Sequence, residues 1–432
     1  MENKVLIIAY YWPPSGGSGV QRWLKFVKYL PSLGWKPYVF TPENPAFAVQ
    51  DQSLLKDVPT EAEVIRFPIW EPYEAFFKLS SLFGNKKSAK PTDLVSGKKK
   101  SLFQNVSTWV RGNFFIPDPR VFWIRPSVKF LSDFIRDNQI NTIITTGPPH
   151  SMHLIGLKLK KKNPSIKWLA DFRDPWSEWG LLDSLMVGSI ARKLHRRLES
   201  DVLDNADHII TITPFYVKQF ARLAEKPITL LTNGYDEDDF KHMVIKRTDK
   251  FVIRHAGIIN EKCDPKPFLV ALEEVMNHHP DFKNDVHLDF VGDVHPQVKE
   301  FIGQSSVLSS AITFTKSVPH HDLITLYGES ALLLIILTGY KDAEGYMPGK
   351  LFEYLATGLP ILGTGPSNGD AAVLLNESKA GEMIEGNDKE KIKQALLNAY
   401  ENWKNSKSVT AQLLGFKKYS RKSITKELTS YL

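Results

Sequence analysis

The most specific candidate for chemistry is the segment YMPGKLFEYLATGLPILGTG at 346–365. Pro348 and Gly349 precede a predicted short helix, and Lys350 occupies its first turn. A cation is electrostatically unfavourable at a helix N-terminus, so we expect an anionic ligand there that compensates for it. Glu353 lies three residues further along the same helical face and can accept hydrogen bonds from sugar or ribose hydroxyls. The segment therefore predicts a ligand site at the start of this helix.

A glycine-rich turn, PPSGGSGVQR at 13–22, connects the first apolar run to a predicted helix. Glycines let backbone N–H groups approach an anion closely, and the helix N-terminus adds a favourable dipole. A dinucleotide fingerprint would need a third glycine where Arg22 stands after Gly17 and Gly19, which argues against an oxidoreductase. We expect Gly16 and Gly17 to face a phosphate, with a plain tight turn as the alternative.

Two histidines follow another apolar run, in TTGPPHSMHLIG at 145–156. His150 and His153 lie three residues apart at the start of a predicted helix, so both are expected to face a crevice. A histidine there can donate to a developing phosphate charge or transfer a proton. A metal site would need a third ligand at suitable spacing, which the sequence does not offer. A structural or capping role is the alternative.

Charged residues gather in LADFRDPWSEW at 169–179, again where an apolar run ends. Arg173 can bind an anion through two parallel hydrogen bonds, and Asp171 or Asp174 can accept a hydrogen bond from a substrate hydroxyl. Trp176 flanks them. Charges this close to a buried strand are costly unless they are paired or used. The alternative is an internal Arg–Asp ion pair that shapes the loop.

Apolar runs of strand length, alternating with helical patterns, must position these motifs. Runs that are apolar on both faces predict parallel strands covered by helices on both sides. The expected strands lie at 4–9, 37–41, 63–67, 142–146, 166–172, 207–212, 228–232, 251–256, 286–291, 312–316, 331–337 and 359–363. The alternation restarts after a polar stretch at 235–250, so the predicted fold class is α/β, with two doubly wound domains joined there.

Composition excludes several classes of protein. Apolar residues make up 42% of the 432 residues and charged residues 24%, as in a globular protein. Cys263 is the single cysteine, which rules out an internal disulfide framework and predicts a reducing, cytoplasmic location. The apolar N-terminal run is interpreted as a first strand rather than a signal peptide, and no run approaches the roughly 20 residues that cross a bilayer.

Charge is unevenly distributed along the chain. Residues 1–233 hold 32 Lys and Arg against 21 Asp and Glu, whereas the remainder holds 23 against 27. The basic half predicts contact with an anionic surface or substrate, with ordinary solvated lysines as the alternative. Aromatic residues at 69–125 enclose a basic stretch at 86–100, which predicts a membrane contact, a substrate-binding lip or simple packing of a loop.

The segment P-G-K-L-F-E-Y-L-A-T-G-L-P-I strongly resembles the donor-site segment of family 4-type retaining glycosyltransferases. Other segments match that family in order: the opening strand with its Gly-rich loop, LADFRDPW, ADHIITITP (206–214), LLTNGYDEDDF (230–240), FVIRHAGI, DFVGD (289–293) and KKYSRKSITKELTSYL (417–432). The resemblance covers nearly the whole chain and is loose at 69–125. It implies the GT-B fold, in which two Rossmann-like domains face a central cleft.

The resemblance also implies a division of roles between the domains. Residues 1–235 would form the acceptor domain, with the last helix, 418–432, packing back onto it. Residues 250–417 would bind a nucleotide-sugar donor. No metal and no further cofactor are implied. The sequence DED at 236–238 is similar to the Asp-x-Asp metal motif of other glycosyltransferases, but it lies in the interdomain stretch and we reject that interpretation.

Family positions carry over onto single residues of the donor site. Glu353 matches the glutamate that binds the nucleotide ribose, whereas its usual partner falls on Gly345, one residue after Glu344. The expected donor-binding residues are Gly16, Gly17, Gly257, Lys262, Glu344, Pro348, Gly349, Lys350, Leu351 and Glu353.

The basic pair that stabilises the donor diphosphate in the family is altered here. Ile258 follows Gly257 where an arginine is usual. Lys262 and Lys350, together with amides of the Gly-rich loop, are therefore expected to offset the charge of the leaving nucleotide. Such electrostatic stabilisation is commonly the largest contribution to catalysis.

Many relatives place a histidine near the position that Arg173 occupies here. The resemblance therefore implies that His150 or His153 takes the role of that missing histidine. The residues expected to act in catalysis are Glu353, Lys350, Lys262, His150, His153 and Asp174. Those expected on the acceptor side are Asp171, Arg173, Asp174 and Trp176. The implied mechanism retains the anomeric configuration and needs no protein nucleophile.

The resemblance implies a cytoplasmic sugar transferase in cell-surface polysaccharide or glycolipid assembly. Its expected partners are the nucleotide-sugar donor and a glycan or lipid-linked acceptor, but not nucleic acid. The charge of the basic N-terminal domain, rather than the resemblance, predicts the contact with an anionic membrane. Two alternatives stay open. One is a GT-B enzyme that epimerises or hydrolyses nucleotide sugars; the other is a catalytically silent scaffold that binds them, which Ile258 and the displaced Glu344 favour.

Overall fold

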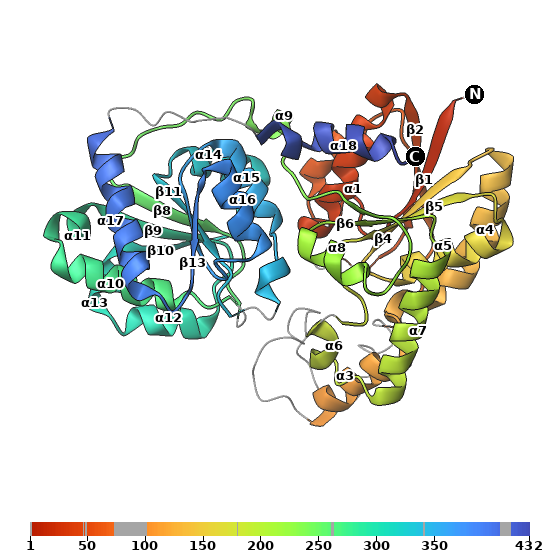
Figure 1. The fold of residues 1–432 in the computed structure, drawn as a ribbon, viewed down its shortest axis with the longest axis horizontal. Coiled ribbons are helices and arrows are strands. Elements are labelled where there is room, and N and C mark those ends of the chain that lie inside the picture. The colour runs from red at the N-terminus through yellow and green to blue at the C-terminus, as the bar shows by residue number, and fades with distance from the viewer. Residues whose placement is uncertain are drawn as a thin grey trace. The chain divides into compact units, whose positions relative to one another are not determined.

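The computed structural model describes residues 2–45, 47, 50–72, 102–178, 180–260, 263–339, 342–406 and 416–432. The chain divides into two compact units. Unit 1 consists of Met1–Thr232 and Arg421–Leu432, and unit 2 of Asn233–Ser420. Each unit is a sheet with helices on both faces (Figure 1).

Within the described residues, unit 1 is built on a parallel sheet of seven strands. They are β1 (Asn3–Ile8), β2 (Trp35–Pro42), β3 (Glu63–Phe67), β4 (Thr142–Gly147), β5 (Lys167–Phe172), β6 (His208–Thr211) and β7 (Ile228–Leu230). Their order is β3-β2-β1-β4-β5-β6-β7, with every neighbouring pair parallel. The order reverses between β1 and β4. Doubly wound sheets bind ligands at such a reversal, beyond the carboxyl ends of the strands.

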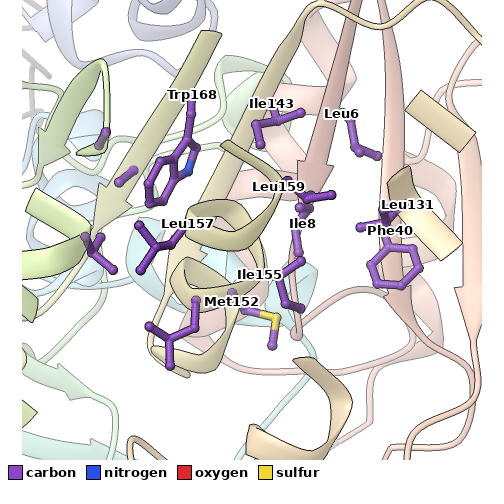
Figure 2. Close-up of a cluster of buried hydrophobic side chains, with 14 of the residues drawn as sticks. Leu6, Ile8, Phe40, Leu131, Ile143, Met152, Ile155, Leu157, Leu159 and Trp168 are labelled. Carbon is purple, nitrogen blue, oxygen red and sulfur yellow. The ribbon is translucent and has the colours of Figure 1, made fainter. Parts of the chain in front are cut away.

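Helices cover both faces of this sheet. One face carries α4 (Ile124–Asp137), α5 (Ser151–Lys162), α7 (Ser189–Asn205) and α8 (Pro214–Phe220), and the other α1 (Ser18–Tyr29) and α18 (Arg421–Thr429). Figure 2 shows the core on the first face, where Ile155 and Leu157 of α5 lie over Ile8 and Trp168 of the strands. The other helical segments are η1 (Pro31–Leu33), η2 (Gln52–Asp57), α3 (Leu102–Phe114), η4 (Pro119–Trp123) and α6 (Gly180–Ser184).

Unit 2 has a second parallel sheet, for which the described residues supply six strands. They are β8 (Phe251–Ala256), β9 (Val286–Val291), β10 (Ile312–Thr315), β11 (Leu332–Ile336), β12 (Ile361–Thr364) and β13 (Gly381–Ile384). Their order is β10-β9-β8-β11-β12-β13, again with parallel neighbours. The reversal falls between β8 and β11, which makes the carboxyl end of β8 the expected place for a ligand.

Two groups of helices enclose this sheet. One face carries α10 (Lys266–His278), α11 (Pro280–Asp285), α12 (Pro296–Gly303), α13 (Ser306–Ala311) and α17 (Lys389–Asn405). The other carries α14 (His320–Gly328), α15 (Gly349–Thr357) and α16 (Asp370–Ser378) (Figure 1). Shorter segments are α9 (Glu237–Phe240), η5 (Ala343–Gly345) and η6 (Phe416–Tyr419).

The predicted fold class is confirmed, and so are the twelve predicted strands, within a few residues at their ends. Sequence analysis missed β13, because only Met383 and Ile384 of its four residues are buried and no apolar run marks it. It also missed α3 in the segment 69–125. The basic stretch 86–100 lies outside the described residues. Among the helices that are described, none is both long and apolar enough to span a membrane.

Candidate functional site

Helix α15 forms where the sequence predicts it. Gly358 ends it in a left-handed conformation, with φ +68°, which favours glycine. Leu351, Phe352 and Leu355 are fully buried in the core on that face of the sheet. This packing determines which way the polar side chains of the helix point. Because its side chain lies in the core, Leu351 can contribute only backbone atoms to a donor site.

The first turn of α15 presents backbone donors to the space before it. The amide of Leu351 donates to the carbonyl oxygen of Pro348 at 3.0 Å, and no side chain among the described residues caps the amides of Gly349 and Lys350. A Cβ added at Gly349 would meet no described atom within 4 Å, so this residue leaves open space on its Cβ side. A helix N-terminus with free N–H groups attracts phosphates and other anions.

Lys350 projects from this turn toward the end of β8. Its Nζ lies 3.0 Å from Nε2 of His255, whose Nδ1 lies 2.9 Å from the carbonyl oxygen of Leu334. A carbonyl only accepts, so Nδ1 carries the proton and Nε2 accepts a hydrogen bond from the ammonium. Burial holds the pKa of His255 well below its ordinary value, so the ring is neutral. Burial also lowers the pKa of Lys350 to about 8.

Two glycines leave the backbone beside this ammonium without side chains. Gly257 directly follows β8 and has φ +126°, and a Cβ there would lie 3.3 Å from Nζ of Lys350. Gly292 follows β9 with φ +125°, and its Cβ would lie only 2.7 Å from the carbonyl oxygen of Gly257. Any side chain at these positions would be strained and would crowd the end of the sheet. The cation therefore sits where the strand order reverses.

Glu353 lies one turn further along α15. Its Oε1 is 3.1 Å from Nε2 of His320, and its Oε2 accepts a hydrogen bond of 3.1 Å from the hydroxyl of Tyr327. Asp239 Oδ2 is 3.9 Å from Nδ1 of the same histidine. The Glu353 side chain is 23% exposed. Both oxygens are thus oriented by α14, and the carboxylate can still accept hydrogen bonds from a hydroxyl ligand.

Sequence analysis missed the partners of these two residues. His255 carried a usable signal, because a histidine inside the apolar strand run FVIRHA must find a buried hydrogen-bond partner. His320 and Tyr327 belong to α14 and to no motif. Their proximity to Glu353 results from the packing of α14 on α15, which the spacing of residues does not encode.

Glu344 and Lys262 are the remaining expected donor residues of unit 2. Glu344 is exposed on η5, and its backbone packs against Gly369, where a Cβ would lie 3.0 Å from the Cα of Glu344. Its place in a donor site stays a prediction. Lys262 lies outside the described residues.

In unit 1, Asp171 has a structural role. It is fully buried at the end of β5, where Nη2 of Arg22 lies 2.9 Å from Oδ1. Trp23 Nε1 and Thr146 Oγ1 donate to Oδ2 at 2.7 and 2.9 Å. Burial alone would raise the pKa of this carboxyl, but the charge of Arg22 and the hydrogen bonds from Arg22 and Trp23 lower it. Asp171 is therefore engaged in an internal ion pair with Arg22, as the structural alternative proposed, and its expected place on the acceptor side stays a prediction.

Arg173 connects two loops at the carboxyl end of this sheet. Its guanidinium donates to the carbonyl oxygens of Gly19 at 2.8 Å, of Gly147 at 3.2 Å and of Pro148. Asp174 follows it, half-buried and with no hydrogen-bond partner among the described residues. Burial raises the pKa of Asp174, and the nearby Arg173 charge opposes that rise. Of the two aspartates, Asp174 is the one whose carboxylate is available to a ligand.

The expected histidines and Trp176 lie in the core of unit 1 rather than along an open crevice. Trp176 is 1% exposed, stacks on His150 with ring centroids 4.8 Å apart, and donates its indole N–H to Nδ1 of His195 at 3.0 Å. His153 is fully buried, and Thr145 Oγ1 lies 2.8 Å from its Nδ1. Burial lowers the pKa of His153 to about 3, so the ring stays neutral. In this arrangement the three rings stabilise the loop that carries Arg173.

The Gly-rich turn leads into α1 as expected. Gly17 has φ +86° and precedes the helix, which no described side chain caps. A Cβ at Gly17 would meet no described atom within 4 Å. The backbone of Gly17 can therefore be approached by an anion, and the contact of Gly16 and Gly17 with a phosphate stays a prediction.

The acidic run at 236–238 forms a local hydrogen bond to the backbone. Asp236 Oδ1 accepts a hydrogen bond of 3.1 Å from the amide of Asp238 and so caps α9. Among the described residues there is no cluster of three or more His, Cys, Asp or Glu side chains able to hold a metal ion.

The second unit matches a known protein family. Residues 250–402 match the family described as "Glycosyl transferases group 1". This range contains Gly257, Lys350 and Glu353. No curated protein matches the chain in sequence.

Solved structures share the fold along both chains. A glycosyltransferase from Rickettsia africae ESF-5 is 15% identical with a TM-score of 0.61, over 100% of this chain and 98% of its own. Sucrose-phosphate synthase from Thermosynechococcus elongatus is 14% identical with a TM-score of 0.60, over 99% and 98%. The E. coli trehalose-6-phosphate protein bound with UDP-2-fluoro glucose is 10% identical with a TM-score of 0.60, over 99% and 98%. These likenesses establish the GT-B fold, and the match at 250–402 supports a glycosyltransferase.

Proposed function

We propose that the protein transfers a sugar from a nucleotide-sugar donor to a hydroxyl of a glycan or lipid-linked acceptor, with retention at the anomeric carbon. One observation carries the proposal: α15 joins an open, uncapped N-terminus, a cation at the strand reversal and an oriented carboxylate. A nucleoside diphosphate sugar offers the complementary groups, namely a diphosphate and vicinal hydroxyls. That all three lie inside the range matching the glycosyltransferase family supports this assignment.

The donor would bind with its diphosphate against the first turn of α15. The amides of that turn and Nζ of Lys350 would donate hydrogen bonds to its oxygens, and Glu353 would accept hydrogen bonds from the ribose hydroxyls. As the bond between the anomeric carbon and the phosphate oxygen breaks, charge builds up on the diphosphate. Donors already in position stabilise that charge without reorganising, and this lowers the barrier.

The acceptor would meet the end of β5 in unit 1. Asp174 would accept a hydrogen bond from the attacking hydroxyl, and Arg173 holds the loop in place through its three carbonyl contacts. In a retaining transfer the acceptor oxygen bonds to the anomeric carbon on the face that the phosphate leaves. The hydroxyl proton passes to the departing phosphate oxygen, so no protein nucleophile is consumed. The buried histidines would then contribute to structure and not to proton transfer.

A thermal-shift screen against UDP, GDP, ADP and their sugars tests donor binding, because a ligand that binds the native state raises its melting temperature. We expect at least one to stabilise the wild type and to lose that effect in Lys350→Ala and Glu353→Ala. If no nucleotide shifts the melting temperature, or both variants respond as the wild type does, the donor site is wrongly placed.

Turnover of the stabilising donor separates transfer from the alternatives. A transferase releases nucleotide rapidly only when an acceptor is present. Equal release without any acceptor would indicate a hydrolase, and interconversion of the donor sugar would indicate an epimerase. Binding with no turnover under any glycan or lipid-linked acceptor would indicate the silent scaffold.

A further inference from the structure

Helix α3 and the start of α7 form one surface at an end of unit 1 (Figure 1). The side chain of Asn113 on α3 binds the segment that leads into α7, because its Nδ2 donates to the carbonyl oxygen of Met186 at 3.1 Å and its Oδ1 accepts from the amide of Gly188 at 2.8 Å. Gly112 packs so closely that a Cβ there would lie 2.3 Å from the carbonyl oxygen of Leu185. The two elements are therefore held in a fixed relation.

This surface, here called the α3–α7 face, exposes large apolar side chains. Ile190 is 86% exposed and Phe114 69%. The members of the set are Val106, Trp109, Phe114, Met186, Ile190 and Leu194. Single exposed apolar residues are ordinary, but a set on two joined elements marks an interaction surface.

Basic side chains lie among these apolar ones. On α7, Lys193 and Arg197 share a helical face with Ile190 and Leu194, at spacings of three and four residues. The segments 102–114 and 186–198 together hold five Lys and Arg and no Asp or Glu. The nearby Asp183 forms an ion pair with Arg192 at 2.8 Å. The face is thus both apolar and positively charged.

We propose that the α3–α7 face docks on an anionic lipid bilayer. Apolar and aromatic side chains enter the boundary between head groups and acyl chains, while Lys and Arg beside them contact anionic head groups. A second copy of this chain fits less well, because a two-fold contact would bring the same basic residues together. Docking would hold unit 1 at the membrane, where a lipid-linked acceptor would be found. The docking itself does not depend on the proposed sugar transfer.

Sedimentation of the full chain with lipid vesicles tests the proposal without donor or acceptor. We expect binding to vesicles of phosphatidylcholine mixed with phosphatidylglycerol, little binding to phosphatidylcholine alone, and weaker binding at high salt. K193E/R197E should weaken binding at least about tenfold, and so should I190S/L194S, although its charge is unchanged. All these side chains are exposed, so each variant should keep the wild-type melting temperature.

The matched control is K158E/K161E, which makes the same charge change at exposed lysines on α5. It should bind within about twofold of the wild type, because the proposed contact combines charge with apolar insertion. Three results would overturn the proposal. The wild type does not bind anionic vesicles, the α5 variant loses as much binding as the α7 variants, or I190S/L194S binds as well as the wild type. Wild-type dimers that I190S/L194S converts to monomers would assign the face to a second copy instead.

Discussion

Nζ of Lys350 lies 3.0 Å from Nε2 of His255, a ring that the carbonyl oxygen of Leu334 holds in a single tautomer. A neutral acceptor orients the ammonium without cancelling its charge. A carboxylate in the same place would neutralise the cation and repel a phosphate. His255 therefore holds the positively charged ammonium of Lys350 beside Gly257, at the point where the strand order of unit 2 reverses.

Affinity for the donor nucleotide should fall as the pH rises past about 8. The pKa of Lys350 in the ligand-free protein is about 8, so above that pH binding a diphosphate must also recapture a proton. Calorimetric titration of the stabilising nucleoside diphosphate between pH 6 and pH 10 measures the effect. Lys350→Met should bind the nucleotide weakly, and its affinity should not fall further above pH 8. A wild-type affinity that stays constant up to pH 10 would contradict the assignment.

Lys350→Met should stabilise the ligand-free protein at neutral pH. The folded-state pKa of Lys350 lies below its usual 10.5, so the fold disfavours the charged form. Below pH 8 folding must bury that charge, whereas above about 10.5 the lysine is neutral in both states. The gain in melting temperature should thus be largest at or below pH 8 and should shrink toward pH 10.5. Lys158→Met, at an exposed position on α5, serves as the control and should change little.

Tyr327→Phe should raise the donor KM severalfold and leave kcat nearly unchanged. The hydroxyl of Tyr327 is one of two groups that orient the carboxylate of Glu353, and loss of one hydrogen bond costs about 1 kcal/mol. Tyr400→Phe is the matched control, because Tyr400 donates to Asp285 elsewhere in unit 2. Steady-state kinetics with varied donor should separate the two variants. Equal KM changes in both would mean that the position of Glu353 does not matter for donor binding.

Replacing Asp171 by alanine should affect stability, whereas replacing Asp174 by alanine should affect sugar transfer. Asp171→Ala leaves Arg22 buried without its carboxylate and should cost about 3–5 kcal/mol of folding free energy. Asp174→Ala removes a carboxylate that has no described partner, so the protein should fold normally and lose sugar transfer. Chemical denaturation and a transfer assay measure the two effects. Full transfer by Asp174→Ala would remove it from the proposed acceptor side.

The strands could be predicted because each is a local apolar run, as in the FVIRHA of β8 or the TIITTG of β4. Helix α15 could be predicted from the sequence as well, because a glycine follows its last turn. Contacts between distant segments were not. Arg22 pairs with Asp171 across 149 positions, and Lys350 meets His255 across 95. No spacing rule connects such residues, so the sequence offered an internal Arg–Asp ion pair only as an alternative and did not identify Arg22 as its arginine.

Burial explains the other differences. His150, His153 and Trp176 follow strands at the ligand-binding edge, which favoured a functional interpretation from sequence. In the structure they pack in the core, because neutral rings behind a loop stabilise it whether or not the loop binds a ligand. A sequence pattern places a residue at the edge of a sheet, but packing decides whether its side chain turns inward.

The most direct measurement is a crystal structure of the protein with the nucleoside diphosphate that stabilises it. We predict diphosphate oxygens within hydrogen-bonding distance, about 3 Å, of both Nζ of Lys350 and the amides of the first turn of α15. The ribose hydroxyls should meet the carboxylate of Glu353. A nucleotide bound away from α15, or one bound there without contact to Lys350, would contradict the account.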